Sequence, residues 1–201
     1  MIDTLSRVAG RDVSRETFEK LEAYAGLLRE ENQRQNLISA STLDRLWERH
    51  IFDSAQLVRF EPHPGASWVD IGSGAGLPGI VVACLVGGPV TLVEPRRLRA
   101  DFLHRAAESL SLNAKIVLGK AERAGGKYDV ITARAVANLS QLLEISAHLS
   151  TRKTTWVLPK GRNAERELVD AQQAWQGAFH VERSVTDPES RIVVVTGVRS
   201  K

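Results

Sequence analysis

The stretch WVDIGSGAGLPGI, residues 68–80, decides the fold class of this chain. Four glycines fall within eight residues, and a short apolar run stands on each side of them. Glycine adopts backbone conformations that other residues avoid, so such a run lets the chain turn closely around a ligand. We predict a strand that ends before Gly72, then a glycine loop, then a helix with Pro78 in its first turn.

Strand-like and helix-like segments alternate after this loop. Short apolar runs predict five strands, at 67–71, 90–94, 114–119, 128–133 and 154–160. Further helices are expected at 96–112, 138–149 and 163–176, the first with Leu98, Phe102 and Leu103 inward. This alternation predicts a parallel sheet with right-handed crossovers. The last two β runs, 179–185 and 191–199, have only a turn between them, so we expect a terminal antiparallel hairpin.

The chain before residue 61 is expected to be helical. Ser14 is a typical N-cap, and apolar residues follow it at helical spacing. A second helix is expected at 41–58, where Arg49 and Asp53 stand four residues apart and could pair. Two prolines and a glycine then interrupt the pattern at 61–66.

We therefore predict two parts, a helical N-terminal extension at 1–60 and a main domain at 61–201. The whole chain has a net charge of +3. Residues 1–60 hold nine basic and ten acidic side chains, so the remaining 18 basic and 14 acidic residues give the main domain +4. A basic main domain is compatible with a nucleic-acid partner.

Composition excludes several classes of protein. The longest apolar run, 80–86, is too short to span a membrane, and the first residues lack the apolar core of a secretory signal. The single cysteine, Cys84, cannot form an internal disulfide, and it is expected to be a small buried side chain. We expect a cytoplasmic protein without a membrane partner, and no metal, because no His, Cys and Asp cluster has ligand spacing.

Two common phosphate-binding loops fit the glycine stretch poorly. A P-loop ends in Gly-Lys-Ser/Thr, whereas Ile80 follows Gly79 here. The dinucleotide fingerprint G-x-G-x-x-G does match at 74–79, but Pro78 removes an N–H donor that a pyrophosphate would use.

A third interpretation starts at Asp70 and covers D-x-G-x-G-x-G, with Gly72, Gly74 and Gly76. Glu94 ends the next strand, where a carboxylate can accept both hydroxyls of a ribose. This pattern is typical of S-adenosylmethionine sites, and the terminal hairpin is typical of methyltransferase sheets. We therefore favour a methyltransferase over a dinucleotide enzyme, with Asp70 positioning the loop or meeting the methionine amino group.

Motifs along nearly the whole chain resemble one family, RsmG (GidB, glucose-inhibited division protein B), the 16S rRNA guanine-N7 methyltransferases. The matches are Asn32 with Asn36-Leu37, Arg49-His50-x-x-Asp53-Ser54, DIGSGAGLPGI, Ala121-Glu122, Ala133-Arg134-Ala135 and Leu158-Pro159-Lys160-Gly161. Two positions depart from the family pattern: Glu31 stands where a Trp is usual, and Leu98 where many members have Lys.

The resemblance implies a class I S-adenosylmethionine-dependent methyltransferase fold, an α/β Rossmann-like sheet with a terminal antiparallel hairpin and the helical N-terminal extension. It implies methylation of a guanine N7 in the decoding-centre loop of 16S rRNA, presented as naked RNA, a 30S subunit or an assembly intermediate. We expect a monomer. A methyltransferase acting on another RNA or on a small molecule remains the alternative.

The resemblance also implies site residues. Gly72, Leu77, Ala121, Glu122 and Arg134 would contact the cofactor, beside Asp70, Gly74, Gly76 and Glu94 from the loop pattern. The candidates for RNA or substrate contact are Asn36, Arg49, His50, Asp53, Arg96, Arg97, Arg99 and Lys160. For His50 the residue pattern alone favours a core histidine, because it lies on an apolar helix face.

No residue is assigned to proton transfer. Guanine N7 carries a lone pair and no hydrogen, so methyl transfer needs no general base. The protein's contribution would be to align N7 with the methyl group.

Overall fold

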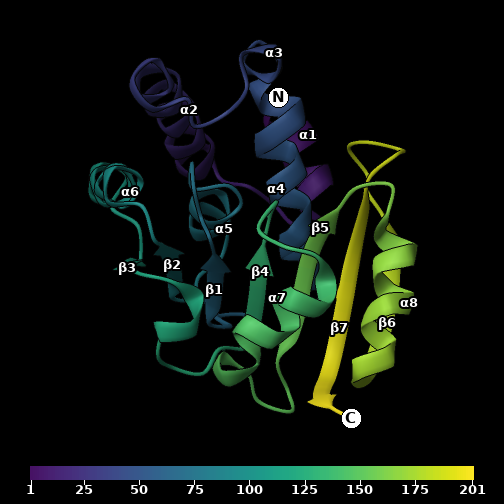
Figure 1. Cartoon of the computed structure of the whole chain (residues 1–201). Coiled ribbons are helices and arrows are strands. Elements are labelled where there is room, and N and C mark those ends of the chain that lie inside the picture. The colour runs from purple at the N-terminus through teal and green to yellow at the C-terminus, as the bar shows by residue number, and fades with distance from the viewer.

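The computed structural model describes residues 1–201 and contains one sheet of seven strands in the order β3-β2-β1-β4-β5-β7-β6 (Figure 1). The strands are β1 Trp68–Ile71, β2 Val90–Glu94, β3 Ala114–Leu118, β4 Val130–Ala133, β5 Thr155–Lys160, β6 Trp175–Arg183 and β7 Arg191–Ser200. Strands β1 to β5 are parallel, and β7 runs antiparallel to both of its neighbours, β5 and β6. The predicted parallel sheet and terminal hairpin are confirmed.

Helices cover both faces of the sheet. In the main domain these are α5 Gly79–Leu85, α6 Arg97–Ser109, α7 Leu139–Ser146 and α8 Ala164–Ala174, with single turns η3 Ala121–Arg123 and η4 Ala147–Leu149. Trp68 packs in a cluster with residues of α5 and α6, whereas the next residue, Val69, packs with residues of α7 and α8. Alternate side chains of a strand point to opposite faces, so apolar runs such as WVDI and VTLVE suit strands covered on both sides.

The N-terminal segment is helical but interrupted. It contains α1 Ile2–Ala9, α2 Arg15–Gln35, α3 Ala40–Leu43, the π-helix η1 Trp47–Phe52, α4 Asp53–Ala55 and the 3-10 helix η2 Gln56–Phe60. Ser14 caps α2 as predicted, because its side chain accepts a hydrogen bond from the Thr17 N–H. The helix predicted at 41–58 is interrupted by a turn at Asp44 and Arg45 and then continues as π, α and 3-10 turns; α1 was not foreseen.

Residues before and after position 60 share one hydrophobic core. Leu5 of α1, Leu21 and Leu28 of α2, and Ile51 of η1 belong to the same cluster as Trp68 of β1. Figure 1 shows α2 and α4 beyond the ends at which the β1 and β4 arrows terminate. The extension therefore packs where the parallel strands end. No helix combines the length and the apolar character needed to cross a membrane.

One expectation about the core is wrong. Phe102 and Leu103 of α6 are buried as predicted, but Leu98 in its first turn is 69% exposed. Leu98 therefore belongs to the surface, beside the exposed Arg96 and Arg97.

Candidate functional site

The strand order reverses between β1 and β4. In an open parallel sheet the loops leave such a point in opposite directions, and a crevice opens at the carboxyl ends of the strands. The glycine loop follows β1 here, Arg134 follows β4, Glu94 ends β2 and Lys160 ends β5. The topology therefore places most of the predicted site residues along one edge of the sheet.

Three glycines of the loop after β1 have left-handed backbones. The φ angles are +66° at Gly72, +57° at Gly74 and +90° at Gly76, a region that side chains disfavour. The N–H groups of Gly72 and Ser73 both donate to the Val93 carbonyl, at 2.8 and 3.1 Å. The loop is thus fastened to the end of β2.

Glu94 strengthens the same connection. The side chain is 2% exposed, and its Oε2 accepts from the Gly74 N–H at 2.8 Å while Oε1 accepts from the Arg96 N–H at 2.9 Å. Each carboxylate oxygen can accept more than one hydrogen bond, so Glu94 retains capacity for further donors.

Asp70 is a buried acid with one unsatisfied oxygen. Its Oδ2 accepts from the Gly79 N–H at 3.0 Å, whereas Oδ1 is buried without a hydrogen-bond partner. Burial raises the pKa of Asp70 to about 7, although the hydrogen bond from the Gly79 N–H and the charge of Arg134 oppose the shift. A buried carboxylate oxygen without a donor is costly, and a cationic ligand would relieve it.

Tyr24 supports the glycine loop from the N-terminal segment. Its hydroxyl donates to the Ala75 carbonyl at 2.7 Å, and the side chain is fully buried. Burial raises the pKa of Tyr24 well above its usual value, so the group stays a donor. Helix α2 is therefore part of the structure that shapes the loop.

Arg134 is a largely enclosed guanidinium that contacts a histidine. Its Nη1 lies 3.1 Å from His50 Nδ1, and His50 Nε2 lies 2.9 Å from Thr42 Oγ1. Arginine only donates, so His50 Nδ1 is the acceptor and the proton resides on Nε2. Burial and the charges of Arg134 and Arg49 lower the pKa of His50 to about 4, which keeps the ring neutral.

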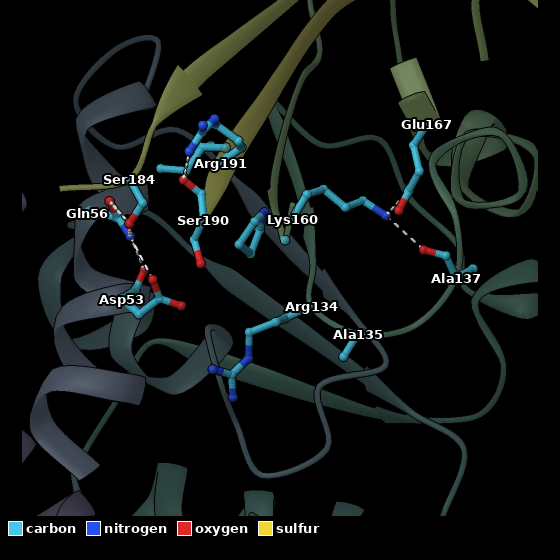
Figure 2. Close-up of a pocket in the computed structure, with 13 residues that line it drawn as sticks. Asp53, Gln56, Arg134, Ala135, Ala137, Lys160, Glu167, Ser184, Ser190 and Arg191 are labelled. Carbon is cyan, nitrogen blue, oxygen red and sulfur yellow. Dashed lines mark hydrogen bonds and ion pairs between the residues drawn. The ribbon is translucent and has the colours of Figure 1, made fainter. Parts of the chain in front are cut away.

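A pocket of about 330 Å³ is lined by Arg134, which follows β4, and by Lys160 at the end of β5, and no residue of the glycine loop at 72–79 lines it. Figure 2 shows this pocket. Its polar walls include Asp53, Gln56, Arg134, Lys160 and Arg191. It has the size of a small-ligand site.

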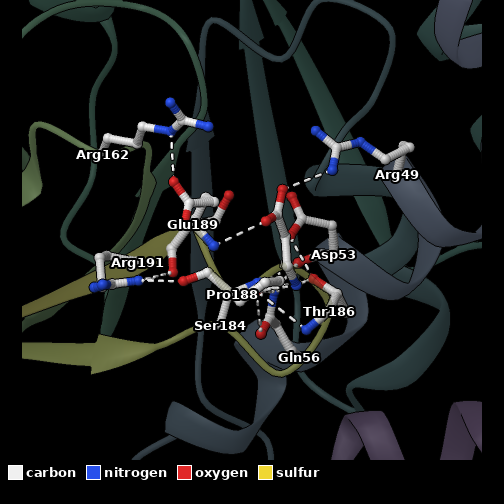
Figure 3. A network of polar contacts seen from close by, with 11 residues as sticks. Arg49, Asp53, Gln56, Arg162, Ser184, Thr186, Pro188, Glu189 and Arg191 are labelled. Carbon is white, nitrogen blue, oxygen red and sulfur yellow. Dashed lines mark hydrogen bonds and ion pairs between the residues drawn. The ribbon is translucent and has the colours of Figure 1, made fainter.

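The wall on the N-terminal side is a hydrogen-bonded network to the β6–β7 turn (Figure 3). Asp53 Oδ1 accepts from Gln56 Nε2 at 2.8 Å and from Thr186 Oγ1 at 2.9 Å. Gln56 Oε1 in turn accepts from the Val185 N–H at 2.9 Å. The network holds the 3-10 helix η2 against the hairpin.

Arg49 and Asp53, whose spacing would allow an ion pair, do not pair with each other. Arg49 Nη1 instead contacts Asp187 Oδ2 at 2.6 Å, in the β6–β7 turn. This contact joins residues 138 positions apart, so helical spacing could not have indicated it.

Lys160 differs from the free cation expected for phosphate contact. Its ammonium donates to the Ala137 carbonyl at 2.8 Å and pairs with Glu167 at 2.9 Å, and its side chain is 10% exposed. In this arrangement Lys160 connects β5 to the chain before α7.

The other candidates lie around this edge. Ala121 is buried and Glu122 is exposed in η3, after β3, and Leu77 is 3% exposed. Asn36 ends α2 with a left-handed backbone, and Arg96, Arg97 and Arg99 stand at the start of α6. No three His, Cys, Asp or Glu side chains are gathered so as to hold a metal ion.

Glu31, at the position where a Trp was expected, has structural partners. Its carboxylate accepts from Arg105 of α6 at 2.8 Å and from Gln35, and the residue is 8% exposed. An ion pair between α2 and α6 thus occupies this position.

The sequence interpretation missed three residues of the site: Tyr24, Gln56 and Asp187. Each makes its contact with a residue more than 50 positions away. Only the apolar spacing around Tyr24 signalled its burial, and nothing in the sequence marked its hydroxyl contact.

Known proteins resemble the chain over nearly its whole length. The family model for rRNA small subunit methyltransferase G matches residues 17–192. The protein named ribosomal RNA small subunit methyltransferase G from Zymomonas mobilis is 45% identical, covering 94% of this chain and 90% of that protein. The protein of the same name from Erythrobacter litoralis is 47% identical, with 90% and 88% covered.

Solved structures share the fold at low identity. A mutant of MtNAS in complex with S-adenosylmethionine superposes with a TM-score of 0.62 at 19% identity, covering 89% of this chain and 74% of that chain. The ribosomal protein L11 methylase from Lactobacillus delbrueckii subsp. bulgaricus gives 0.60 at 14% identity, with 74% and 78% covered. These neighbours confirm the class I methyltransferase fold, and the sequence relatives with the family match establish that the chain belongs to the rRNA small subunit methyltransferase G family.

Proposed function

We propose that this protein transfers the methyl group of S-adenosylmethionine to N7 of a guanine in the decoding-centre loop of 16S rRNA. The observation that carries this proposal is the arrangement at the switch point. The glycine loop and Glu94 stand on one side of Arg134, and a polar pocket opens on the other. Together with family membership, this arrangement supports a donor site and an acceptor site that meet near Arg134.

The residues present suit S-adenosylmethionine. The unpartnered Oδ1 of Asp70 is an acceptor for the cationic amino group, and Glu94 can accept the ribose hydroxyls. The half-buried Arg134 has N–H groups that could meet the methionine carboxylate, and Ala121 with Glu122 would flank the adenine. Bound there, the cofactor supplies a methyl group that is already strongly electrophilic.

The protein's part in the reaction is then to hold and orient. Guanine N7 needs no deprotonation, so no side chain has to act as a base. The fastened glycine loop and the pocket fix the two reactants relative to each other, which removes much of the entropic cost of bringing them together. Arg49, Arg96, Arg97 and Arg99, at the rim, would contact RNA phosphates.

The deciding experiment maps N7-methylguanine in small-subunit rRNA from cells with and without the gene. Loss of one such methyl group on deletion, and its return when the gene is restored, is the expected result. Unchanged methylation would refute the rRNA proposal and leave the alternative, another RNA or a small molecule.

Assays with the purified protein on naked 16S rRNA and on 30S particles identify the form of RNA that it methylates. Cytoplasmic location and a monomeric state belong to the same proposal, and size-exclusion chromatography with light scattering tests the latter.

A further inference from the structure

One carboxylate oxygen of Asp53 is hydrogen-bonded within the protein, and the other is free. Gln56 and Thr186 both donate to Oδ1, at 2.8 and 2.9 Å, which uses the two lone pairs of that oxygen. Oδ2 has no hydrogen-bond partner within the protein, and Figure 2 shows it directed into the pocket. The hydrogen bonds from Gln56 and Thr186 to Oδ1 thus fix the orientation of Oδ2, which is free to accept from a ligand.

The pocket has donors on its opposite side. Arg134 carries only donors, and its contact with His50 uses one of its two terminal nitrogens. The other cations that line the pocket, Lys160 and Arg191, are already paired with Glu167 and Glu165. The cavity therefore offers an acceptor at Asp53 and donors at Arg134.

Guanine has the matching polarity. Its N1–H and 2-amino group are neighbouring donors on the Watson–Crick edge, whereas O6, at the corner between the two edges, and N7 are acceptors. Adenine has an acceptor at N1, which would face the carboxylate unfavourably. A base that enters with its Watson–Crick edge toward Asp53 turns its opposite edge toward Arg134 and the glycine loop, so that O6 faces the donors of Arg134 and the N7 lone pair stays free for the methyl group.

We propose that Asp53 selects guanine by accepting hydrogen bonds from N1–H and the 2-amino group through Oδ2, while Gln56 and Thr186 position the carboxylate. This inference rests on the proposed methylation of guanine N7. It assigns to Asp53 contact with the base rather than with the RNA backbone.

The same contact favours the reaction itself. The N7 lone pair forms the new bond to the methyl carbon while the carbon–sulfur bond breaks, and the electron pair of that bond stays on sulfur. The guanine becomes positively charged, and its N1–H becomes a stronger donor. The hydrogen bond to Asp53 therefore strengthens as the transition state is approached, which is the condition for a contact to accelerate a step.

The test compares two substrates and two protein variants. Small-subunit RNA is prepared with guanine or hypoxanthine at the methylated position; hypoxanthine retains N7 and N1–H but lacks the 2-amino group. The wild-type protein is expected to favour guanine in kcat/KM by about tenfold or more, the effect of one hydrogen bond to a charged group. In Asp53→Asn the amide oxygen can still accept from Gln56 and Thr186, but the amide nitrogen faces the base. That variant should lose most activity on guanine and discriminate between the two bases by about twofold at most.

The matched control is Asp187→Asn, an acid in the same network that faces Arg49 rather than the pocket. Its guanine preference should equal that of the wild type, whatever happens to its overall rate. Binding of S-adenosylhomocysteine establishes that each variant is folded.

The outcomes separate the two proposals. A wild-type protein that methylates guanine N7 but treats hypoxanthine equally well overturns the role of Asp53, whether or not the variant folds. Full preference for guanine in a folded Asp53→Asn protein overturns it too. If the wild-type protein methylates N7 in neither RNA, the proposed function itself fails.

Discussion

The imidazole of His50 accepts a hydrogen bond from the guanidinium of Arg134, with 3.1 Å between Nδ1 and Nη1. The histidine comes from the π-helix η1 of the N-terminal segment, and the arginine directly follows β4. The contact requires a neutral ring, and the lowered pKa of His50, about 4, provides one at physiological pH. His50 thus lies behind Arg134 and orients it toward the crevice.

Replacing His50 tests this orienting contact. His50→Phe keeps the ring shape but removes the acceptor, and it should weaken binding of S-adenosylhomocysteine about tenfold by leaving a buried donor unpaired. His50→Asn places an amide oxygen near Nδ1, so its affinity should stay within about threefold of wild type. Isothermal titration calorimetry measures both affinities. Equal losses in the two variants would mean that His50 only fills space.

Removing the Tyr24 hydroxyl should loosen the glycine loop. Tyr24→Phe leaves the buried Ala75 carbonyl without its donor, at a cost of about 1–3 kcal/mol in the free energy of unfolding. Urea denaturation measures that cost, and a weaker affinity for S-adenosylhomocysteine should accompany it. Tyr128→Phe is the matched control, because that hydroxyl donates to the Gly125 carbonyl at an exposed site. Comparable effects in both variants would exclude a special role for Tyr24.

The alternation of strands and helices was predictable because strands covered on both faces need nearly continuous apolar runs. VTLVE and TWVLPK are such runs, and local composition alone marks them. The pairing of β6 with β7 followed from two β runs with only a turn between them, whereas the place of β7 beside β5 did not.

The side-chain partners within the site could not be predicted from local pattern. Helical spacing suggested Asp53 as a partner for Arg49, but in the folded protein the turn of the hairpin brings Asp187 to Arg49 instead. Leu98 continues the apolar spacing of Phe102, yet it is exposed, because burial depends on what covers a turn and not on its period.

Adding a methyl group at Gly76 should disrupt the loop. A Cβ there would lie 2.6 Å from Ile80 Cγ1 and 3.0 Å from Leu103 Cδ2, at a φ of +90°. Gly76→Ala should cost about 3 kcal/mol or more, the sum of a disfavoured backbone and an overpacked core. Gly65→Ala is the control: its φ is +79°, but nothing lies within 4 Å, so only about 1–2 kcal/mol is expected. Urea denaturation of both variants gives the comparison, and equal costs would show that the close packing around Gly76 is unimportant.

Asp70 should give the protein a pH-dependent stability. Its pKa is about 7 when folded and near 3.8 in the unfolded chain, so the folded state binds the extra proton between these values. The extra proton stabilises the folded state. This stabilisation is complete below pH 3.8 and is lost as the pH rises through 7, which lowers the free energy of unfolding by up to about 4 kcal/mol in total. The side chain of Asp70→Asn cannot ionise. As the pH rises from 5 to 8, the free energy of unfolding should therefore fall for the wild type but not for the variant, and urea denaturation measures both. A constant difference across this range would mean that Asp70 titrates normally. S-adenosylhomocysteine should reduce the stability that the wild-type protein loses at pH 8. Its cationic amino group would face the ionised carboxylate of Asp70 and favour that form.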